Sequence, residues 1–593
     1  MTTIERWILL AAAVLAAAAP SLLAVNVPPS PTFLNQALAL LLWGGFVALA
    51  ALLAPAPRPL RAAALDAALP LAALGGLAAA VLWSWGPGAL PAGLALSGLG
   101  LLLACVVLLL GGAAAQGSPR ASELFALFCA GWVAAGVLDA AIGALQVFAP
   151  QLADGRWIAR SGLPGRAVGN LRQPNHLSSL LLWAAIAIVP LLELRRLRRG
   201  AGAALFALLC FAVVLTASRT GVIGIGLLAL WGLLDARLAR PTRRLLLAAP
   251  VLYLLGWLGL SAWAQLSHHA FGGEARLAEA DLSGSRFGIW ANTLALIRQQ
   301  PWAGVGFGEF NLAWTLTPFP GRPTAFFDHT HDLPLQLLVE LGLPLGGAVL
   351  ALLLAALWRA WRLAGRDADT ERAVTRRSAW MMLLLIGLHS LLEYPLWYAY
   401  FLLPTAWLFG YALGRPAPPL AAMGAPQAAH GAGPGRARQP LFAAGLLLAL
   451  GSALAVLDYA RVARVFAPPH DGSTLAQRIA GGQRSVLFAH HAAYAAATLD
   501  DDIDAFDPAF ALAPHYLLDA RLMIAWAKAL ARAGELDKAR ALAQRLREFR
   551  NPQADEFFAA CDKVEHEAGS ADAARPFQCE PPVRPPGWRD YLR

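Results

Sequence analysis

Four short segments of the chain gather side chains that can bind sugar or phosphate groups and move protons. They are residues 169–176, 216–221, 326–332 and 389–400. Their amides, guanidinium groups, imidazoles and carboxylates hydrogen-bond polar ligands, neutralise phosphate oxygens and act as general acids or bases. Each segment lies beside an apolar run, so we expect helix ends to position these groups.

The first segment places a proline among dense hydrogen-bonding groups. Its polar side chains are Asn170, Arg172, Gln173, Asn175 and His176. Pro174 suits the first turn of a helix. Helix capping beside an interfacial loop is the alternative interpretation, but capping requires one such side chain rather than four. The segment therefore predicts recognition of a polar, sugar-like or phosphate-bearing ligand, with Arg172 as a reserve candidate.

Arg219 lies in the second segment, a tight turn between two apolar runs. An arginine so close to apolar segments is costly unless it is paired, and its planar guanidinium suits phosphate oxygens. Arg286 is a second candidate of the same type, at the start of an amphipathic helix that we expect in a long loop. For both arginines, extension of the side chain to the membrane interface is the alternative.

The third segment contains His329, His331 and Asp332 just before a long apolar run. Histidines at a membrane surface bind a metal, act as a base, or remain hydrated at the interface. A metal is the weakest interpretation, because no compact set of further ligands follows. A neutral imidazole can remove a proton from an attacking hydroxyl. Asp332 would then orient the imidazole, or simply cap the next helix.

The fourth segment combines ionisable and aromatic residues at a membrane boundary. The candidates here are Glu393, Tyr394 and Trp397, with His389 as a reserve candidate. An interfacial aromatic belt explains Trp397, Tyr398 and Tyr400. A belt leaves Glu393 unexplained, and an acidic group at such a boundary is by default functional.

The composition identifies the class of protein that carries these segments. Of the 593 residues, 58% are hydrophobic and 14% are charged, and the mean hydropathy is +0.54. Soluble domains are about a quarter charged, so the chain is predicted to be a polytopic membrane protein. The formal net charge of +10 is assigned to cytoplasmic turns and anionic lipid rather than to nucleic acid.

Apolar runs predict about thirteen passes, since a span needs about 20 apolar residues. The predicted passes are 7–25, 33–54, 67–85, 90–113, 122–148, 175–193, 202–217, 220–236, 243–265, 333–357, 378–392, 396–413 and 440–458. Arginine clusters at 195–199, 237–244 and 359–377 lie in connections that stay cytoplasmic. The N-terminus is then inside and the C-terminus outside, and all four polar segments lie outside.

Two domains are predicted. Residues 1–460 form the transmembrane domain with a large outer loop at 266–332, and residues 461–593 form a small, helical, TPR-like outer domain. Residues 414–439, rich in proline, glycine and alanine, are predicted to be a flexible cytoplasmic connection. In the tail, Cys561 and Cys579 would face an oxidising compartment, and the sequence leaves open whether they pair.

With these segments in view, the chain resembles the bacterial O-antigen ligase superfamily, and most closely its protein O-oligosaccharyltransferase branch. The resemblance covers roughly residues 160–415. It rests on Gly169–His176, Ser218–Gly221, His331–Asp332 with the following Leu335–Gly342, and Glu393–Tyr398. Relatives usually have His-Asn where this chain has His331-Asp332, so the role of Asp332 stays open and His329 is kept as a reserve.

The resemblance implies an all-α, GT-C-type glycosyltransferase in the bacterial inner membrane, with its active site facing the periplasm. The donor would be an undecaprenyl-pyrophosphate-linked oligosaccharide, and the acceptor a Ser or Thr hydroxyl of an exported, pilin-like protein. We expect no cofactor and no metal. His331 is predicted to be the general base, and Arg219 and Arg286 to bind the donor pyrophosphate. Asn170, Gln173, Asn175, His176, Glu393, Tyr394 and Trp397 would bind substrate.

Two other interpretations stay open. A ligase that transfers the glycan to lipid A-core, or a Wzy-type polymerase, would use the same donor with another acceptor. A transporter would place ionisable groups near the bilayer midplane and show internal repeats, whereas the polar groups here gather at one boundary.

Overall fold

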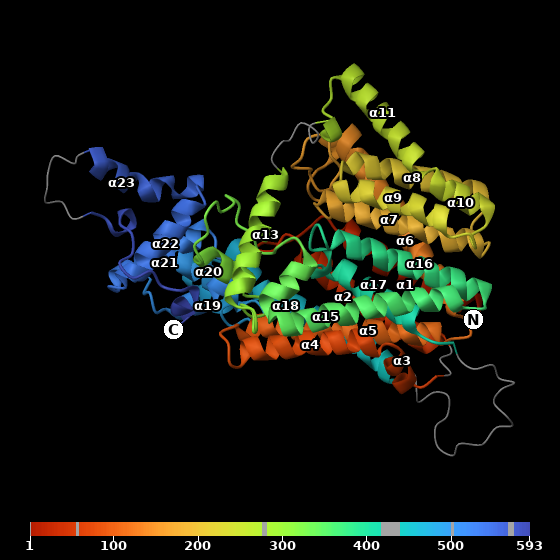
Figure 1. Ribbon diagram of the computed structural model, residues 1–593, viewed down its shortest axis with the longest axis horizontal. Coiled ribbons are helices and arrows are strands. Elements are labelled where there is room, and N and C mark those ends of the chain that lie inside the picture. Colours follow the sequence, from red (N-terminus) through yellow and green to blue (C-terminus); the bar gives the residue numbers. More distant parts are fainter. Residues whose placement is uncertain are drawn as a thin grey trace, which may run out of the picture. The chain divides into compact units, whose positions relative to one another are not determined.

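In the computed structural model, every regular element is a helix (Figure 1) over the described residues 2–54, 58–274, 282–416, 439–499, 503–566 and 575–592. The all-α fold predicted from the sequence is confirmed. Most of the connection predicted at 414–439 lies outside the described residues.

Ten of the described helices are long and apolar enough to cross a membrane. They are α1 (Thr3–Leu22), α2 (Phe33–Leu53), α4 (Ala68–Trp85), α5 (Ala92–Gln116), α6 (Ala121–Phe148), α7 (Pro174–Glu193), α8 (Arg199–Thr216), α10 and α11 taken together (Arg240–Ser267), α15 (Leu333–Arg366) and α18 (Gln439–Phe466). Two further predicted passes correspond to the shorter apolar helices α9 (Arg219–Leu234) and α17 (Ala399–Leu413). The pass predicted at 378–392 falls in α16 (Thr370–His389), whose first turns are charged.

The chain divides into two compact units. The first contains Met1–Leu74, Leu101–Ala280 and Ala351–Val456, and the second contains Gly75–Gly100, Asp281–Leu350 and Leu457–Arg593. The second unit thus joins most of the loop predicted at 266–332 with the tail. Its boundaries fall within α4, α5, α15 and α18.

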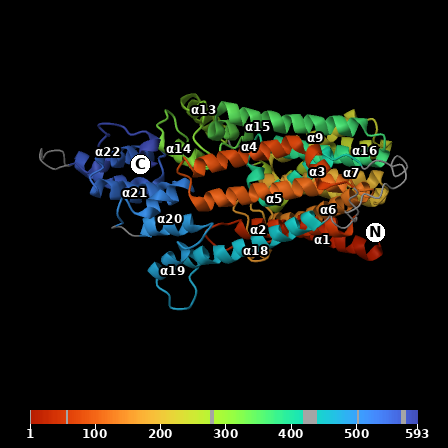
Figure 2. The same ribbon diagram turned by 90° about the horizontal axis from the view of Figure 1, so that it is seen from below.

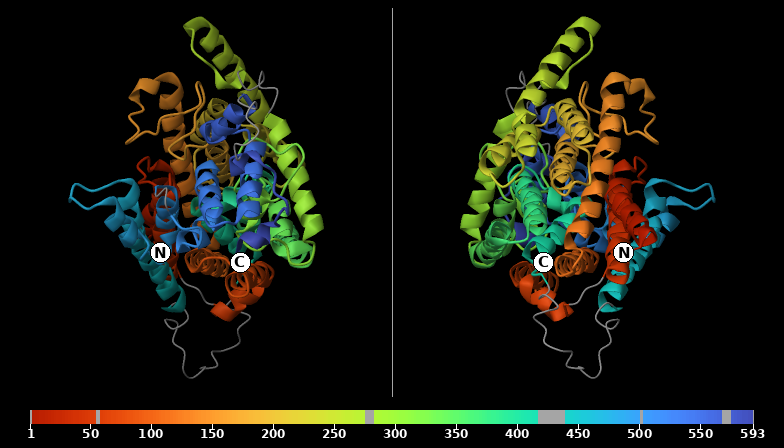
Figure 3. Two further views of the ribbon diagram at one scale, coloured as in Figure 1. Left: turned by 90° about the vertical axis from the view of Figure 1, so that its left-hand side faces the viewer. Right: turned by 90° about the vertical axis from the view of Figure 1, so that its right-hand side faces the viewer.

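Helix α7 is the centre of the first unit. It packs against α6, α8, α9 and α16, and 94% of its apolar window is buried. Trp183 of this helix is fully buried, and its ring meets that of Trp132 edge-on at 4.7 Å. Helix α11, coloured yellow-green in Figure 3, projects from α8 and α9 and is mostly exposed. Because protein surrounds α7, its polar residues are shielded from lipid.

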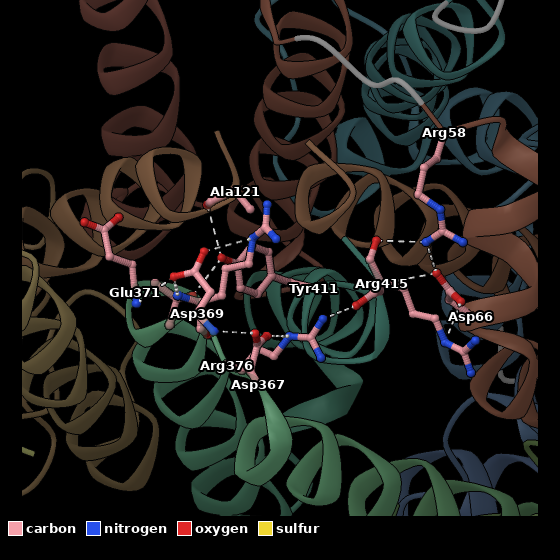
Figure 4. Close-up of polar contacts among 12 residues, drawn as sticks. Arg58, Asp66, Ala121, Asp367, Asp369, Glu371, Arg376, Tyr411 and Arg415 are labelled. Atoms are coloured by element: carbon pink, nitrogen blue, oxygen red, sulfur yellow. Dashed lines mark hydrogen bonds and ion pairs between the residues drawn. The ribbon is translucent and has the colours of Figure 1, made fainter. Parts of the chain in front are cut away.

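The basic connections of the first unit meet at one set of helix ends. Figure 4 shows Arg58 and Arg415 both reaching Asp66, the last residue of α3 (Leu60–Asp66), and Arg376 reaching Asp367 at 3.2 Å. Connections that the sequence predicts on a single side therefore contact one another directly.

A second group of these connections is joined in the same way. Arg377 pairs with Asp235 at 2.8 Å, and Arg237 donates to the carbonyl of Gly365 at 2.7 Å. Glu193, at the end of α7, accepts a hydrogen bond from Thr242 of α10 (Arg240–Leu247).

The second unit is built from loop helices and tail helices. The loop supplies α13 (Leu282–Gln299) and α14 (Phe310–Leu316); the tail supplies α19 (Leu475–Gly482), α20 (Ala489–Leu499), α21 (Ala520–Arg532), α22 (Leu536–Glu548) and α23 (Asp555–His566). Helix α14 packs against α13 and α22, and α21 lies beside α22 (Figure 2). Gly534, at φ +82°, makes the turn of this hairpin. Cys561 and Cys579 form a disulfide, which answers the question that the sequence left open.

Polar contacts reinforce the apolar core between loop and tail. His515 bonds the carboxylate of Glu309 at 2.7 and 2.9 Å, and both residues are buried. Arg322 lies over the rings of Trp314 and Phe549 and pairs with Glu548 at 3.1 Å. Burial lowers the pKa of Arg322 to about 10, although Glu548 acts to raise it. The guanidinium therefore stays charged at neutral pH, and the loop is held to the tail by buried charge as well as by apolar packing.

A break at Gly342 divides α15. Gly342 has φ +77° and ψ 168°, a conformation open mainly to glycine. The carbonyls of Val339 and Glu340, which the break frees, accept hydrogen bonds from Val305 and Gly306 at 2.9 and 3.0 Å. The loop after α13 therefore satisfies backbone groups that would otherwise be left unpaired.

We predict that Gly342→Ala destabilises the protein by about 1–3 kcal/mol, because its φ and ψ lie in a backbone region essentially limited to glycine. A Cβ at this position would also lie 2.3 Å from the carbonyl oxygen of Trp302. Thermal unfolding in detergent measures the effect. Gly347→Ala, in the same helix with open space around it, is the control and should be neutral or slightly stabilising. Equal melting temperatures for the two variants would contradict the tight contact at Gly342.

Candidate functional site

Three of the four segments predicted from the sequence meet in the first unit, at the N-terminal end of α7. Asn175 donates to Glu393 at 3.0 Å and accepts from Ser218 at 2.6 Å. All three residues are buried. The Asn175–Ser218–Glu393 network thus joins the start of α7, the turn before α9 and the segment after α16.

Local helix chemistry explains why these residues meet. Gln173 caps α7 by accepting from the backbone N–H groups of Asn175 and His176 at 2.5 and 3.1 Å, and Pro174 occupies the first helical position. Ser218 caps α9 by accepting from Gly221 at 3.1 Å. Two helix N-termini therefore face the network, and their partial positive charge favours an acidic group such as Glu393.

A ring cluster begins at His176, the residue directly after Asn175 on α7. His176 contacts Tyr400 through Nδ1 at 3.2 Å, and its ring packs edge-on against Tyr398 at 4.5 Å. The ring of His389 lies 5.8 Å from that of His176, and its Nδ1 is 2.8 Å from the hydroxyl of Ser179. Both imidazoles are buried, so they lie inside the helical bundle beside the Asn175–Ser218–Glu393 network.

Asn170 and Arg172 support the backbone around the site. Asn170 accepts from Ala159 at 2.8 Å and donates to the carbonyls of Leu22 and Trp157 at 2.6 and 2.9 Å. Arg172, at φ +57°, donates to carbonyls of the connection between α1 and α2. These bonds use both amide hydrogens of Asn170 and one acceptor position of its oxygen, and its predicted contact with substrate stays a prediction.

Arg219 begins α9 with its side chain exposed. Within the described part of the chain, its guanidinium makes no hydrogen bond or ion pair. A cation at a helix N-terminus is unfavourable, so an anionic ligand here would relieve that cost. Tyr394 and Trp397 are half-buried, with ring centroids 6.4 Å apart. The aromatic pair offers an apolar surface beside Glu393.

The third segment, residues 326–332, belongs to the second unit. His331 has φ +57° and is half-buried, with its ring edge-on to Phe327 at 5.4 Å. A left-handed conformation is uncommon outside glycine, and such conformations cluster at active sites. His329 pairs with Asp328 at 3.0 Å. Burial acts to raise the pKa of Asp328, but His329 and His331 outweigh it and hold the pKa below its ordinary value.

The residues after His331 fix the backbone of this segment. Asp332 caps α15 by accepting from Leu335 at 2.8 Å, and burial raises its pKa. Thr330 donates through its backbone to Gln336 at 2.8 Å, while its carbonyl accepts from Trp290 of α13 at 2.9 Å. Arg286 lies half-buried on the same α13. Loop helix and α15 together therefore hold the histidine segment.

The structure adds polar groups that the sequence interpretation missed. Ser178 and Ser179 follow the motif on α7, and Ser178 donates to Ser218 at 3.1 Å. In the second unit, Asn311 donates to the carbonyl of Phe327 and accepts from Leu518 of the tail, both at 2.8 Å. The serines follow Asn175 at helical spacing, which was a usable signal. The Asn311 contact links residues more than 200 positions apart and leaves no local signal.

Comparisons with known proteins agree with the segments identified above. A family model described as O-antigen ligase matches residues 204–350, one described as protein glycosylation ligase matches 167–189, and one described as virulence factor membrane-bound polymerase, C-terminal, matches 378–560. The predicted resemblance to the O-antigen ligase superfamily and its protein-glycosylating branch is confirmed.

Two curated proteins of Acinetobacter baylyi are similar to this chain. It is 29% identical over 255 residues to a general O-oligosaccharyltransferase, covering 41% of this chain and 43% of that protein. It is 28% identical over 257 residues to a ComP-specific O-oligosaccharyltransferase, covering 42% of this chain and 44% of that protein. The chain therefore matches less than half the length of each relative.

We predict that Asn175→Ala lowers the free energy of unfolding by about 1–3 kcal/mol, because Glu393 and Ser218 lose a buried partner. Asn175→Asp should cost more, since it places a second carboxylate beside Glu393. Thermal unfolding of the purified protein checks both variants. Gln265→Ala, an exposed change on α11, is the matched control. The network would lose its assigned role if Asn175→Asp melted at the same temperature as this control.

Proposed function

The chain is related to the O-antigen ligase superfamily, and from this premise we propose that it transfers a glycan from an undecaprenyl-pyrophosphate-linked donor to Ser or Thr hydroxyls of an exported protein such as a pilin. One observation carries the proposal. Each of the three matched regions contains one or two of the polar segments found from the sequence, and the segments of the first unit meet through the Asn175–Ser218–Glu393 network.

The glycosylation ligase match, at 167–189, favours a protein acceptor. It covers Asn170 to His176 and the first turns of α7, where the network begins. Both curated relatives are named as O-oligosaccharyltransferases. A second candidate has support as well, because the O-antigen ligase and polymerase models cover longer stretches. That candidate transfers the same glycan to lipid A-core or to another glycan.

In the proposed reaction, the acceptor oxygen forms a bond to the anomeric carbon while the bond from that carbon to the pyrophosphate breaks. Negative charge then grows on the leaving lipid pyrophosphate. Arg219 and Arg286 would stabilise this charge with donors whose fixed geometry suits phosphate oxygens. The exposed position of Arg219 at the start of α9 supports this role, since the side chain is available to a ligand.

The hydroxyl proton needs a base, and we assign that role to His331. The hydrogen bonds around Thr330 and Asp332 fix the backbone that carries the imidazole, and that backbone is left-handed at His331. The undecaprenyl pyrophosphate leaves as an anion, so no second proton is required at that oxygen. The proposal includes no metal, because permanently charged guanidinium groups supply the positive charge. His329 remains the reserve base and His389 a reserve candidate, and Glu393, Tyr394 and Trp397 would contact substrate.

We further propose that the protein lies in the bacterial inner membrane with its active site and C-terminus in the periplasm and its N-terminus in the cytoplasm. Basic connections favour the cytoplasmic side, and those of the first unit contact one another at one set of helix ends. A disulfide in the tail suits an oxidising compartment such as the periplasm.

Mass spectrometry of exported proteins from cells with and without this chain tests the proposed function. Glycan-bearing Ser or Thr peptides that disappear on deletion, and return with the wild-type gene, are the expected result. Loss of lipopolysaccharide ladders with unchanged glycopeptides would select the ligase candidate instead.

We predict that His331→Ala lowers glycan transfer by about 10²–10⁴-fold, the range for loss of a general base. The measurement is the rate at which acceptor peptide is glycosylated by purified protein at saturating donor. His470→Ala, an exposed histidine of the tail, controls for removal of an imidazole. Unchanged transfer by His331→Ala would refute the base role, and the same experiment on His329→Ala would then test the reserve candidate.

Arg219→Lys keeps the charge but loses the two-pronged donor geometry. We predict donor affinity about tenfold to a hundredfold weaker, because hydrogen bonds to charged groups contribute about 1.5–3 kcal/mol. The KM for lipid-linked donor reports the change. Arg298→Lys, an exposed residue at the end of α13, should behave as wild type. A wild-type KM in Arg219→Lys would count against the pyrophosphate role.

A further inference from the structure

Four arginines line a cleft in the second unit that the proposed reaction does not use. The cleft has a volume of about 460 Å³ and is lined by Arg461, Arg464, Ser473, Gln477, Arg478, Gly481 and Arg484. This volume lies within the roughly 300–1,000 Å³ of clefts that hold small ligands. Every charged side chain in its lining is basic.

Two carboxylates near the cleft, those of Asp458 and Asp471, already have hydrogen-bond and ion-pair partners. Asp458 accepts from the Ser485 hydroxyl at 2.7 Å and from the backbone of Leu487 at 2.9 Å, and it contacts Arg461 at 3.2 Å. Asp471 accepts from the Ser473 hydroxyl at 2.6 Å and pairs with Arg464. These bonds fasten the end of α18 to the turns on either side of α19. They leave two of the four positive charges without an acidic neighbour.

Arg478 and Arg484 are the two arginines of the cleft without an acidic neighbour. The Nε of Arg478 is buried and has no hydrogen-bond partner among the described residues, and its Nη1 donates to the carbonyl of Ser473. The Arg484 side chain is exposed and makes no hydrogen bond or ion pair within the described chain. Donors gathered around an open cleft suit a ligand with several acceptor oxygens and negative charge, which describes a phosphate group.

Capping of α18 does not account for this arrangement. Arg464 lies in the last turn of α18, where a cation interacts favourably with the helix C-terminus. Arg478 and Arg484 lie on α19 and on the following turn, so the helix dipole of α18 does not explain them.

The course of α18 indicates where the phosphate comes from. Its large exposed side chains form an apolar ridge: Leu446, Leu447, Leu450, Leu454 and Leu457. A candidate membrane span with such a ridge faces lipid tails. Arg461 follows Leu457 by about one helical turn, so the first arginine of the cleft lies where the apolar face of the span ends. Lipid headgroups occupy that level.

We propose that this arginine cleft binds the phosphate of an anionic phospholipid headgroup at the membrane surface. Arg478 and Arg484 donate to the phosphate oxygens, and the ridge of α18 contacts the acyl chains. The lipid then holds the start of the tail at the membrane surface.

The test uses the full chain purified in detergent and a short-chain phosphatidylglycerol as the probe. Binding is followed by microscale thermophoresis, with short-chain phosphatidylcholine and inorganic phosphate as separate probes. Wild type should bind phosphatidylglycerol saturably. Arg478→Gln/Arg484→Gln should bind it about 30-fold more weakly, the loss expected for two arginines near a membrane surface. Arg521→Gln/Arg550→Gln removes the same charge from exposed positions on the tail and should bind as wild type.

The outcomes separate the possible sources of the phosphate. Binding of inorganic phosphate without binding of phosphatidylglycerol, if lost in the cleft variant, would overturn the lipid assignment and indicate a soluble phosphate ligand. Equal affinity of the cleft variant and wild type for phosphatidylglycerol would overturn the cleft itself. An unchanged melting temperature of the cleft variant shows that weaker binding is not a folding defect.

Discussion

The hydrogen bonds of Asn175 to Ser218 and Glu393 are the constraint on which the rest of the first unit depends. A carboxylate inside an apolar helical bundle is tolerated only when it is hydrogen-bonded. Satisfying Glu393 requires the start of α7, the turn before α9 and the segment after α16 to meet. The burial of α7 on all sides follows from the same requirement, because its polar first turn must be kept away from lipid.

The two ends of the first unit differ in chemistry. One end holds arginine–carboxylate pairs such as Arg376–Asp367 and Arg377–Asp235, and the other holds amides, hydroxyls, imidazoles and the carboxylate of Glu393. Charge pairs at the first end fix connections and leave little capacity for a ligand. At the second end, Arg219 is exposed and Tyr394 and Trp397 are half-buried. Substrate chemistry is therefore expected at the second end.

The sequence predicted the helices well because apolar length is a local property. It also drew attention to Asn175 and Glu393, which the structure brings together, since a polar group beside an apolar run is conspicuous in the sequence. Which of the polar side chains would bond to the backbone, and which to one another, was not predictable. Asn170 is bonded to Ala159, Leu22 and Trp157, and its type alone does not reveal these partners. The union of loop and tail through His515 and Glu309 was missed for the same reason, because it joins residues 206 positions apart.

The break in α15 limits which substitutions this region can accept during evolution. A Cβ on Gly304 would meet the carbonyl oxygen of Glu340 at 2.4 Å, and one on Gly342 would meet that of Trp302 at 2.3 Å. In a packed core, a substitution by a larger side chain is commonly compensated by a smaller side chain at a neighbouring position, so that the total volume is kept. Here each glycine faces backbone atoms, which no substitution can remove. No second-site substitution in a facing side chain can therefore rescue a larger residue at either position.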